Sequence, residues 1–246
     1  MMIKASKLMR KFRLLLCLVT LIALTERIAE SQSNFGMWNT LSVEKEISKR
    51  FSACIEEELR LKDDISRLNL LYTEVGASYK PFKGFKLGLM YRLTEKYADD
   101  DKFYFRNRLM FDVSYKYHVA GFVIGYRSRV QSESENKTNH HEPAWFWRSK
   151  LELKYTIGKF TPFAGTELRY QIKVPRHPET DGGWHRVRYF IGTEYSFNKN
   201  NVIGIYYLKQ HEFYILDPNN LDIIGIQYSV TLAHKKKHKK NRETTE

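Results

Sequence analysis

Charged side chains recur at every second position along much of this 246-residue chain, and they are the residues most able to do chemistry. In extended segments this spacing places them all on one face. Between residues 104 and 197 that face carries 12 basic and 4 acidic groups, so it suits an anionic solute or the head group of a lipopolysaccharide. The same groups could instead fill a narrow lumen as a plug of salt bridges. The charged residues predicted to line this lumen are Glu56, Glu58, Arg60, Glu74, Arg92, Arg106, Arg108, Arg127, Arg129, Arg148, Lys150, Glu152, Glu167, Arg169, Arg188 and Glu194.

A hydrolase that faces lipid is the second candidate. It would need a serine, a histidine and an orienting carboxylate within hydrogen-bond reach of one another. Ser128 and Ser149 fall on the uncharged register of neighbouring segments, but no histidine shares those segments. His211 lies on the same face about three strands away, which is too far at ~4.8 Å per strand. We therefore predict no catalytic residues, and an outer-membrane hydrolase acting on lipid or peptide is kept as the alternative.

A pair of adjacent histidines is the third candidate. His140, His141 and Glu142 lie in a polar segment, and His177 and His185 in the next polar segment could join them around a metal ion. A protein zinc site needs about four ligands at defined spacing, and two neighbours in a polar loop do not supply them. We predict a solvated loop, no metal site and no cofactor.

The elements that must position the charged residues are strands. In the runs 104–117, 122–131, 146–157, 162–174 and 186–197, one register has 31 positions and no charged side chain. The opposite register has 30 positions and 16 charged side chains. A soluble barrel would have to enclose the first set, whereas a transmembrane barrel turns it toward lipid. A slip by one residue would expose those charges to lipid at ~2–4 kcal/mol each near the midplane, so the register is strongly specified.

Eleven strands can be placed along the chain, joined by short connections that alternate with longer polar ones. The longer ones are Lys62–Arg67, Lys96–Lys102, Ser132–Ala144, Pro175–His185 and Tyr214–Asn220. We predict an all-β fold, a monomeric transmembrane antiparallel up-and-down β-barrel of about 10–12 strands, with the short connections in the periplasm. A barrel of this size favours a plugged lumen over an open channel. Eleven strands would make the first and last parallel, whereas bacterial single-chain barrels use even numbers, so the parity stays open. The expected strands span 37–47, 51–61, 68–79, 85–95, 104–117, 121–131, 145–157, 162–174, 186–197, 202–213 and 221–232.

The two ends of the chain differ from the body. The apolar run Leu14 to Leu24 follows a basic stretch and is too short to span a bilayer as a helix, so residues 1–31 are predicted as a cleaved signal peptide. The barrel is expected over residues 35–233, and 234–246 form a basic C-terminal tail. Of the net charge of +13, signal and tail account for +4 each, which leaves +5 for the body and little support for nucleic-acid binding. Without the signal, Cys54 is the only cysteine, so no intramolecular disulfide can form.

These features predict a location in the bacterial outer membrane. The expected partners are outer-membrane lipid and lipopolysaccharide, the barrel assembly machinery and a small anionic molecule, with no nucleic acid. The predicted role is non-catalytic, either structural or interactive at the envelope or the passage of a small anionic solute. A soluble lipid-carrier barrel is a third class, which fractionation with the periplasm without detergent would identify.

Several short motifs resemble an uncharacterised outer-membrane family, domain of unknown function 2490. They are Gly36-Met37-Trp38, Glu57-Glu58-Leu59-Arg60, Gly125-Tyr126-Arg127, Glu167-Leu168-Arg169-Tyr170 and the segment Arg188 to Tyr195, within a resemblance from about Gly36 to Leu232. The resemblance implies an outer-membrane barrel and supplies no activity, cofactor or catalytic residue. The 13-residue tail after Ala233 departs from the usual aromatic C-terminus, so docking to the assembly machinery must use an internal strand end.

Overall fold

The structure is a computed structural model that describes residues 34–97, 103–136, 142–175, 181–215 and 218–233. Within these residues no helix is both long and apolar enough to cross a membrane. The predicted signal peptide and basic tail lie outside the described residues. The strands are β1 (Asn34–Glu46), β2 (Phe51–Lys62), β3 (Arg67–Tyr79), β4 (Phe85–Tyr97), β5 (Phe103–Val119), β6 (Phe122–Glu135), β7 (Ala144–Tyr155), β8 (Phe160–Lys173), β9 (Gly183–Ser196), β10 (Asn201–Glu212) and β11 (Leu221–Leu232).

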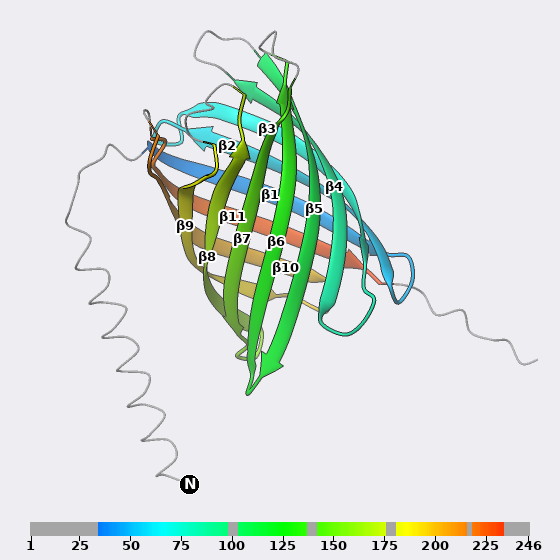
Figure 1. Ribbon diagram of the computed structural model, residues 1–246. Coiled ribbons are helices and arrows are strands. Elements are labelled where there is room, and N and C mark those ends of the chain that lie inside the picture. Colours follow the sequence, from blue (N-terminus) through cyan, green and yellow to red (C-terminus); the bar gives the residue numbers. More distant parts are fainter. Residues whose placement is uncertain (1–33, 98–102, 137–141, 176–180, 216–217, 234–246) are drawn as a thin grey trace, which may run out of the picture. The chain divides into compact units, whose positions relative to one another are not determined.

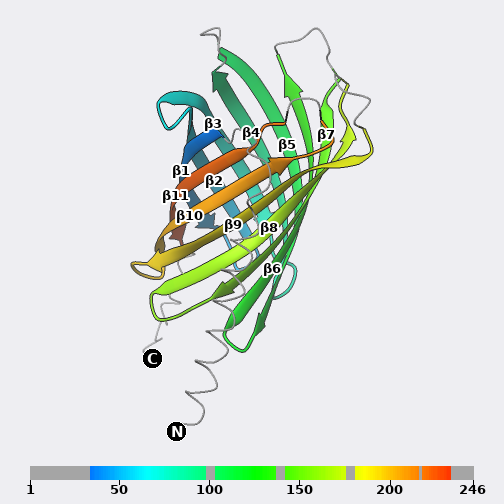
Figure 2. The same cartoon turned by 90° about the vertical axis from the view of Figure 1, so that its left-hand side faces the viewer.

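The eleven strands close into one barrel in which each strand pairs with its sequence neighbours (Figures 1 and 2). Every consecutive pair is antiparallel, and β1 closes the barrel by pairing in parallel with β11. This seam runs from Asn34 opposite Leu221 to Lys45 opposite Leu232. The number of strands lies within the predicted range. It is odd, which settles the parity that the sequence left open.

The connections define two ends of the barrel. At one end, here called the long-loop end, the chain crosses over at residues 136–143, 174–182 and 213–220. At the other, the short-turn end, the connections include residues 47–50, 120–121, 156–159 and 197–200. The predicted difference in loop length is confirmed for these connections. The prediction of a longer connection is wrong for residues 63–66 at the long-loop end. There the chain turns tightly through three residues with positive φ, Asp63, Asp64 and Ile65.

The two registers of the strands face opposite sides of the wall. Leu109, Leu151 and Ile191 are 52%, 50% and 54% exposed on the outside, whereas Arg129 and Glu167 are each only 6% exposed inside. Side chains that alternate in this way bury charge in the lumen and leave an apolar outer wall for lipid. The fold is therefore the predicted all-β transmembrane barrel.

Aromatic side chains gather on the outer wall near both ends of the barrel. At the short-turn end, ring centroids lie 4.7 Å apart for Phe51 and Tyr79 and 4.6 Å apart for Phe122 and Tyr155. Toward the long-loop end, the outer wall carries the tryptophan and tyrosine rings of Trp147, Trp184 and Tyr170, which pack together at 5.2–6.4 Å. Amphipathic rings prefer the level of the lipid head groups, so these two belts mark the membrane interfaces.

Inward glycines let large side chains lie across the inner wall. Gly192 and Gly225 are the direct cross-strand partners of Tyr206, one on each side of β10. A Cβ atom at either glycine would clash with the Tyr206 side chain. The Tyr206 side chain therefore lies against the inner wall, over neighbours that have no side chain.

Candidate functional site

The lumen encloses a cavity of about 680 Å³ whose wall is mostly basic. Thirteen basic and five acidic side chains line it, and they come from β2 and from β4 to β9. Among the residues predicted from the sequence, the structure places the following in the wall: Glu58, Arg60, Arg92, Arg106, Arg108, Arg127, Arg129, Arg148, Lys150, Glu152, Glu167, Arg169, Arg188 and Glu194. The two other predicted residues, Glu56 and Glu74, do not line the cavity and instead hold residues that do.

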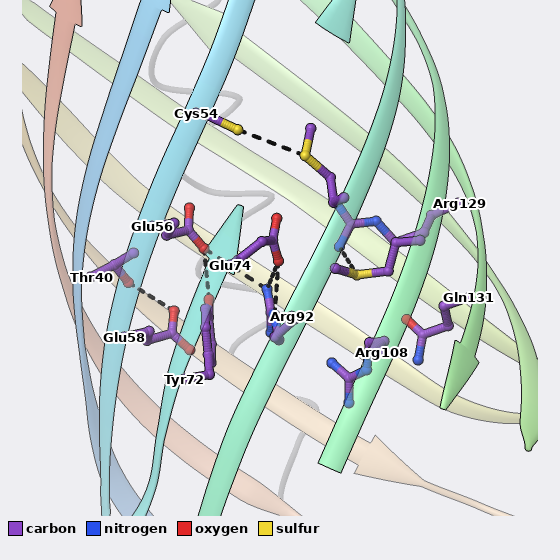
Figure 3. Close-up of polar contacts among 12 residues, drawn as sticks. Thr40, Cys54, Glu56, Glu58, Tyr72, Glu74, Arg92, Arg108, Arg129 and Gln131 are labelled. Atoms are coloured by element: carbon purple, nitrogen blue, oxygen red, sulfur yellow. Dashed lines mark hydrogen bonds and ion pairs between the residues drawn. The ribbon is translucent and has the colours of Figure 1, made fainter. Parts of the chain in front are cut away.

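Three inward acidic groups, Glu56, Glu58 and Glu74, lie on β2 and β3, and each has a partner there or on a neighbouring strand (Figure 3). The Glu74 carboxylate accepts hydrogen bonds of 2.8 and 2.5 Å from the Arg92 guanidinium. The Tyr72 hydroxyl donates to Glu56 at 2.7 Å, and the Arg92 guanidinium lies 3.5 Å from the centre of the Tyr72 ring. Glu58 accepts 2.6 Å and 2.8 Å hydrogen bonds from Arg60 and Thr40. This side of the lumen is a salt-bridged wall with its charges satisfied, as buried charges require.

Four arginines form a single row across the opposite wall, from β6 to β9. Arg129, Arg148, Arg169 and Arg186 stand directly opposite one another in consecutive strand pairs. The row continues to an acid at each end, Asp112 on β5 and Glu212 on β10. We call these four residues the arginine row.

The terminal arginines of the row are each neutralised by the adjacent acid. Arg129 binds Asp112 through two hydrogen bonds of 2.6 and 2.7 Å, and Arg186 forms an ion pair with Glu212. A guanidinium that binds a carboxylate with two parallel hydrogen bonds makes one of the stronger pairs available to side chains.

A single carboxylate, Glu167, serves three arginines from different strands. Its oxygens lie 2.5 Å from Arg148, 2.9 Å from Arg127 and 3.3 Å from Arg188. Because one negative charge faces three positive charges, this buried cluster retains excess positive charge. Glu167 is consequently the electrostatic centre of the basic wall.

Arg169 differs from the other members of the row. Its guanidinium lies 3.7 Å from the centre of the Phe146 ring, and among the described residues no carboxylate lies within ion-pair distance of it. Its Nε atom is buried and has no hydrogen-bond partner among those residues, and the same holds for the Nε atoms of Arg127 and Arg186.

Four charged residues of the cavity wall were not among the predicted site residues: Lys96, Glu133, Lys154 and Arg186. Glu133 lies 2.9 Å from Arg106 and 2.6 Å from Arg108, and so it is a main counterion of β5. The predicted strand ended at residue 131, whereas β6 continues to Glu135. The alternation Gln131, Glu133, Glu135 is present in the sequence and was the signal that could have found it.

The structure does not assemble the hydrolase candidate within its described residues. Ser128 accepts a 2.8 Å hydrogen bond from the Trp147 indole, and Ser149 donates a 3.1 Å hydrogen bond to Tyr126. His211 lies on β10, three strands from β7, and its ring faces Phe213. Both serines thus take part in the aromatic belt.

The metal candidate is not assembled by the residues that can be placed. His140, His141 and His177 lie outside the described residues, and Glu142 pairs with Lys173 at 2.8 Å. His185 is buried and packs beside Phe146 at a ring distance of 6.0 Å. No group of three or more His, Cys, Asp or Glu residues within the described ranges is arranged to hold a metal ion. Cys54 faces the lumen as a free thiol, 3.7 Å from the Met90 sulfur (Figure 3).

Known structures resemble this chain only at low identity. No curated protein matches the chain. Among solved structures, a bacterial polysaccharide outer membrane secretin has a TM-score of 0.47 at 9% identity, over 72% of this chain and 63% of its own. LpxR from Salmonella typhimurium has a TM-score of 0.46 at 10% identity, over 74% and 83% of the two chains. The beta domain of the Bordetella autotransporter BrkA has a TM-score of 0.45 at 11% identity, over 74% of this chain and 81% of its own.

All three structures share fewer than one residue in eight with this chain, and their TM-scores lie below 0.5. The family model described as a protein of unknown function (DUF2490) matches residues 35–220, and the chain therefore belongs to this family.

Proposed function

We propose that this protein is a non-catalytic outer-membrane barrel whose lumen binds small anionic solutes and lets them pass. The observation that supports this role is the excess of basic over acidic side chains in the cavity wall, thirteen against five. A concave surface that carries charges of one sign, with walls of low dielectric constant, concentrates ions of the opposite charge. The strand number lies between barrels that side chains fill and barrels wide enough for an open aqueous channel, so we expect slow passage rather than bulk flow.

The proposed route to the membrane follows from the two ends of the chain and from the outer wall. A cleaved signal peptide at residues 1–31 would direct export, and the barrel assembly machinery would insert the protein. The apolar outer wall with its two aromatic belts would contact outer-membrane lipid and lipopolysaccharide.

The absence of catalysis is part of this proposal. The serines of the outer wall are hydrogen-bonded to aromatic side chains, and His211 lies three strands from Ser149. A nucleophilic serine needs a base within hydrogen-bond reach, which this wall does not offer within the described residues. Among the residues that the structure describes, no contact favours the alternative of a hydrolase acting on lipid or peptide.

Ion selectivity in a planar bilayer tests the proposal. Across a gradient of potassium chloride we expect small current steps whose reversal potential has the sign for chloride passage. Arg188→Gln removes one cavity charge and should weaken the anion preference, whereas Lys199→Gln, in an exposed turn outside the cavity, should not. Cation-selective steps, or no current after repeated verified insertions, would show that the proposed passage of anions is wrong.

A further inference from the structure

The arginine row places four positive charges side by side, and the neighbouring acidic side chains do not fully balance them. Its four members are direct cross-strand partners, from Arg129 on β6 to Arg186 on β9. Like charges placed directly opposite one another destabilise a sheet. The inner face of a barrel curves their side chains toward a common space, which strengthens the repulsion. A compensating negative charge is therefore expected near the middle of the row.

The acids nearby are already occupied. Asp112 and Glu212 neutralise the two ends of the row, and Glu167 is shared by three arginines. Glu133 binds Arg106 and Arg108. Arg169 stands between Arg148 and Arg186 with its guanidinium against the face of Phe146, and Glu133 acts on it only from beyond ion-pair distance.

Arginine cannot relieve this repulsion by losing its proton, because the guanidinium stays charged in proteins. The contact with Phe146 offsets part of the cost of the buried charge but accepts no conventional hydrogen bond. The buried Nε donors of Arg169 and Arg186 have no partner among the described residues. These Nε atoms show that the two guanidiniums are not fully satisfied by the described part of the protein. Both side chains are partly exposed and line the cavity, so a ligand there would meet their terminal nitrogens.

We infer that Arg148, Arg169 and Arg186 form a site for a phosphate group, carried by a phosphate monoester or by inorganic phosphate. This inference rests on the proposed anion-binding lumen and names the chemistry that the lumen selects. A carboxylate offers two oxygens and one charge, which a single guanidinium fork satisfies. A phosphate monoester offers three terminal oxygens and about two negative charges, so forks from neighbouring strands can each engage a different oxygen.

The surroundings of the site suit a ligand larger than the phosphate itself. The cavity of about 680 Å³ greatly exceeds one phosphate group, and Phe163, Phe190 and Tyr206 contribute ring faces to its wall. The row lies toward the long-loop end, since β7 and β9 begin at Ala144 and Gly183 and β8 ends at Lys173. A ligand entering from that end reaches the arginine row before it reaches the centre of the lumen.

Calorimetry on the full-length protein in detergent micelles tests the site. Inorganic phosphate and glucose 6-phosphate should both bind, whereas acetate and unphosphorylated glucose should bind at least about tenfold more weakly. Arg169→Gln should weaken phosphate binding by about tenfold or more while keeping the length and polarity of the side chain. Lys86→Gln is the matched control, because it also removes one cation from an inward position of β4 but lies outside the cavity wall.

Thermal unfolding with and without phosphate is a second test. An arginine with only a structural role would not give the result expected here. Without ligand, Arg169→Gln should unfold at a higher temperature than the wild type, because the variant removes an uncompensated charge. With phosphate, the wild type should gain stability and the variant should not. Arg169→Lys keeps the charge but loses the fork, and it should bind phosphate with intermediate affinity.

The outcomes separate this inference from the proposed function. Equal phosphate binding by the wild type and Arg169→Gln, or equal binding of acetate and phosphate, would overturn the site while leaving an anion-binding lumen. Failure of every anion to bind, together with no anion current, would overturn both. Competition of glucose 6-phosphate by detergent-dispersed lipid A, but not by its dephosphorylated form, would identify a lipid phosphate as the source. Binding of the soluble phosphates without that competition would identify a free solute.

Discussion

Replacing Glu167 with glutamine should lower the free energy of unfolding by about 3–5 kcal/mol, because it removes one partner of a buried ion cluster. The carboxylate is 6% exposed and contacts Arg127, Arg148 and Arg188. Glutamine has nearly the same shape, so the loss would report charge rather than packing. Three guanidiniums would then face one another in the lumen without a shared anion. Unfolding in a denaturant titration, followed by gel mobility without heating, measures the change.

Two further variants test the electrostatic explanation. Glu142→Gln removes a carboxylate whose ion pair with Lys173 is exposed, and it should change stability by less than about 0.5 kcal/mol. Adding Arg148→Gln to Glu167→Gln should restore part of the lost stability, because it removes one of the unbalanced charges. Wild-type stability in the Glu167 variant would show that the cluster is not the centre of the basic wall.

Placing an arginine at Leu151 should destabilise the barrel by about 2–4 kcal/mol in a lipid bilayer. Leu151 is half exposed on the outer wall near the middle of β7, while its neighbours Lys150 and Glu152 face the cavity. An arginine at residue 151 would have to bring its charge into hydrocarbon or bend toward the interface. Folding into phosphatidylcholine vesicles across a urea gradient measures the difference.

The control for this prediction changes the same position without charge. Leu151→Met keeps a flexible apolar side chain and should cost less than about 1.5 kcal/mol. Lys150→Arg, one residue away on the inner face, keeps an inward cation and should also be tolerated. If Leu151→Arg were as stable as Leu151→Met, the outer wall would not be in contact with hydrocarbon.

The sequence was sufficient to predict the barrel because its main signal is local. Alternation with a period of two determines the face of every residue within a strand, so Leu109 and Arg108 could be assigned to opposite sides without knowing any partner. The same signal identified most of the charged residues of the cavity wall. It also located the strand centres well, whereas ends such as Glu135 on β6 were missed.

The contacts inside the lumen could not be predicted, because they depend on the register between strands. Arg127 and Glu167 are separated by 40 residues and lie two strands apart. The register shift between Arg169 and Tyr170 sets which residue of β9 stands opposite Arg169. Alternation predicts which side of the wall a residue faces, but it does not predict the register of one strand against the next. For that reason the sequence suggested a general plug of salt bridges, whereas the structure contains both satisfied pairs and an arginine without a carboxylate among the described residues.

The parallel seam has a topological consequence for the polypeptide. With an odd number of crossings, the chain joins the wall at Asn34 on one rim and leaves it at Leu232 on the opposite rim. In a barrel with an even count, both termini emerge on the same side of the bilayer. Here a peptide tag fused just before Asn34 and another fused after Ala233 would be separated by the membrane, and each would be accessible to a protease from one compartment only.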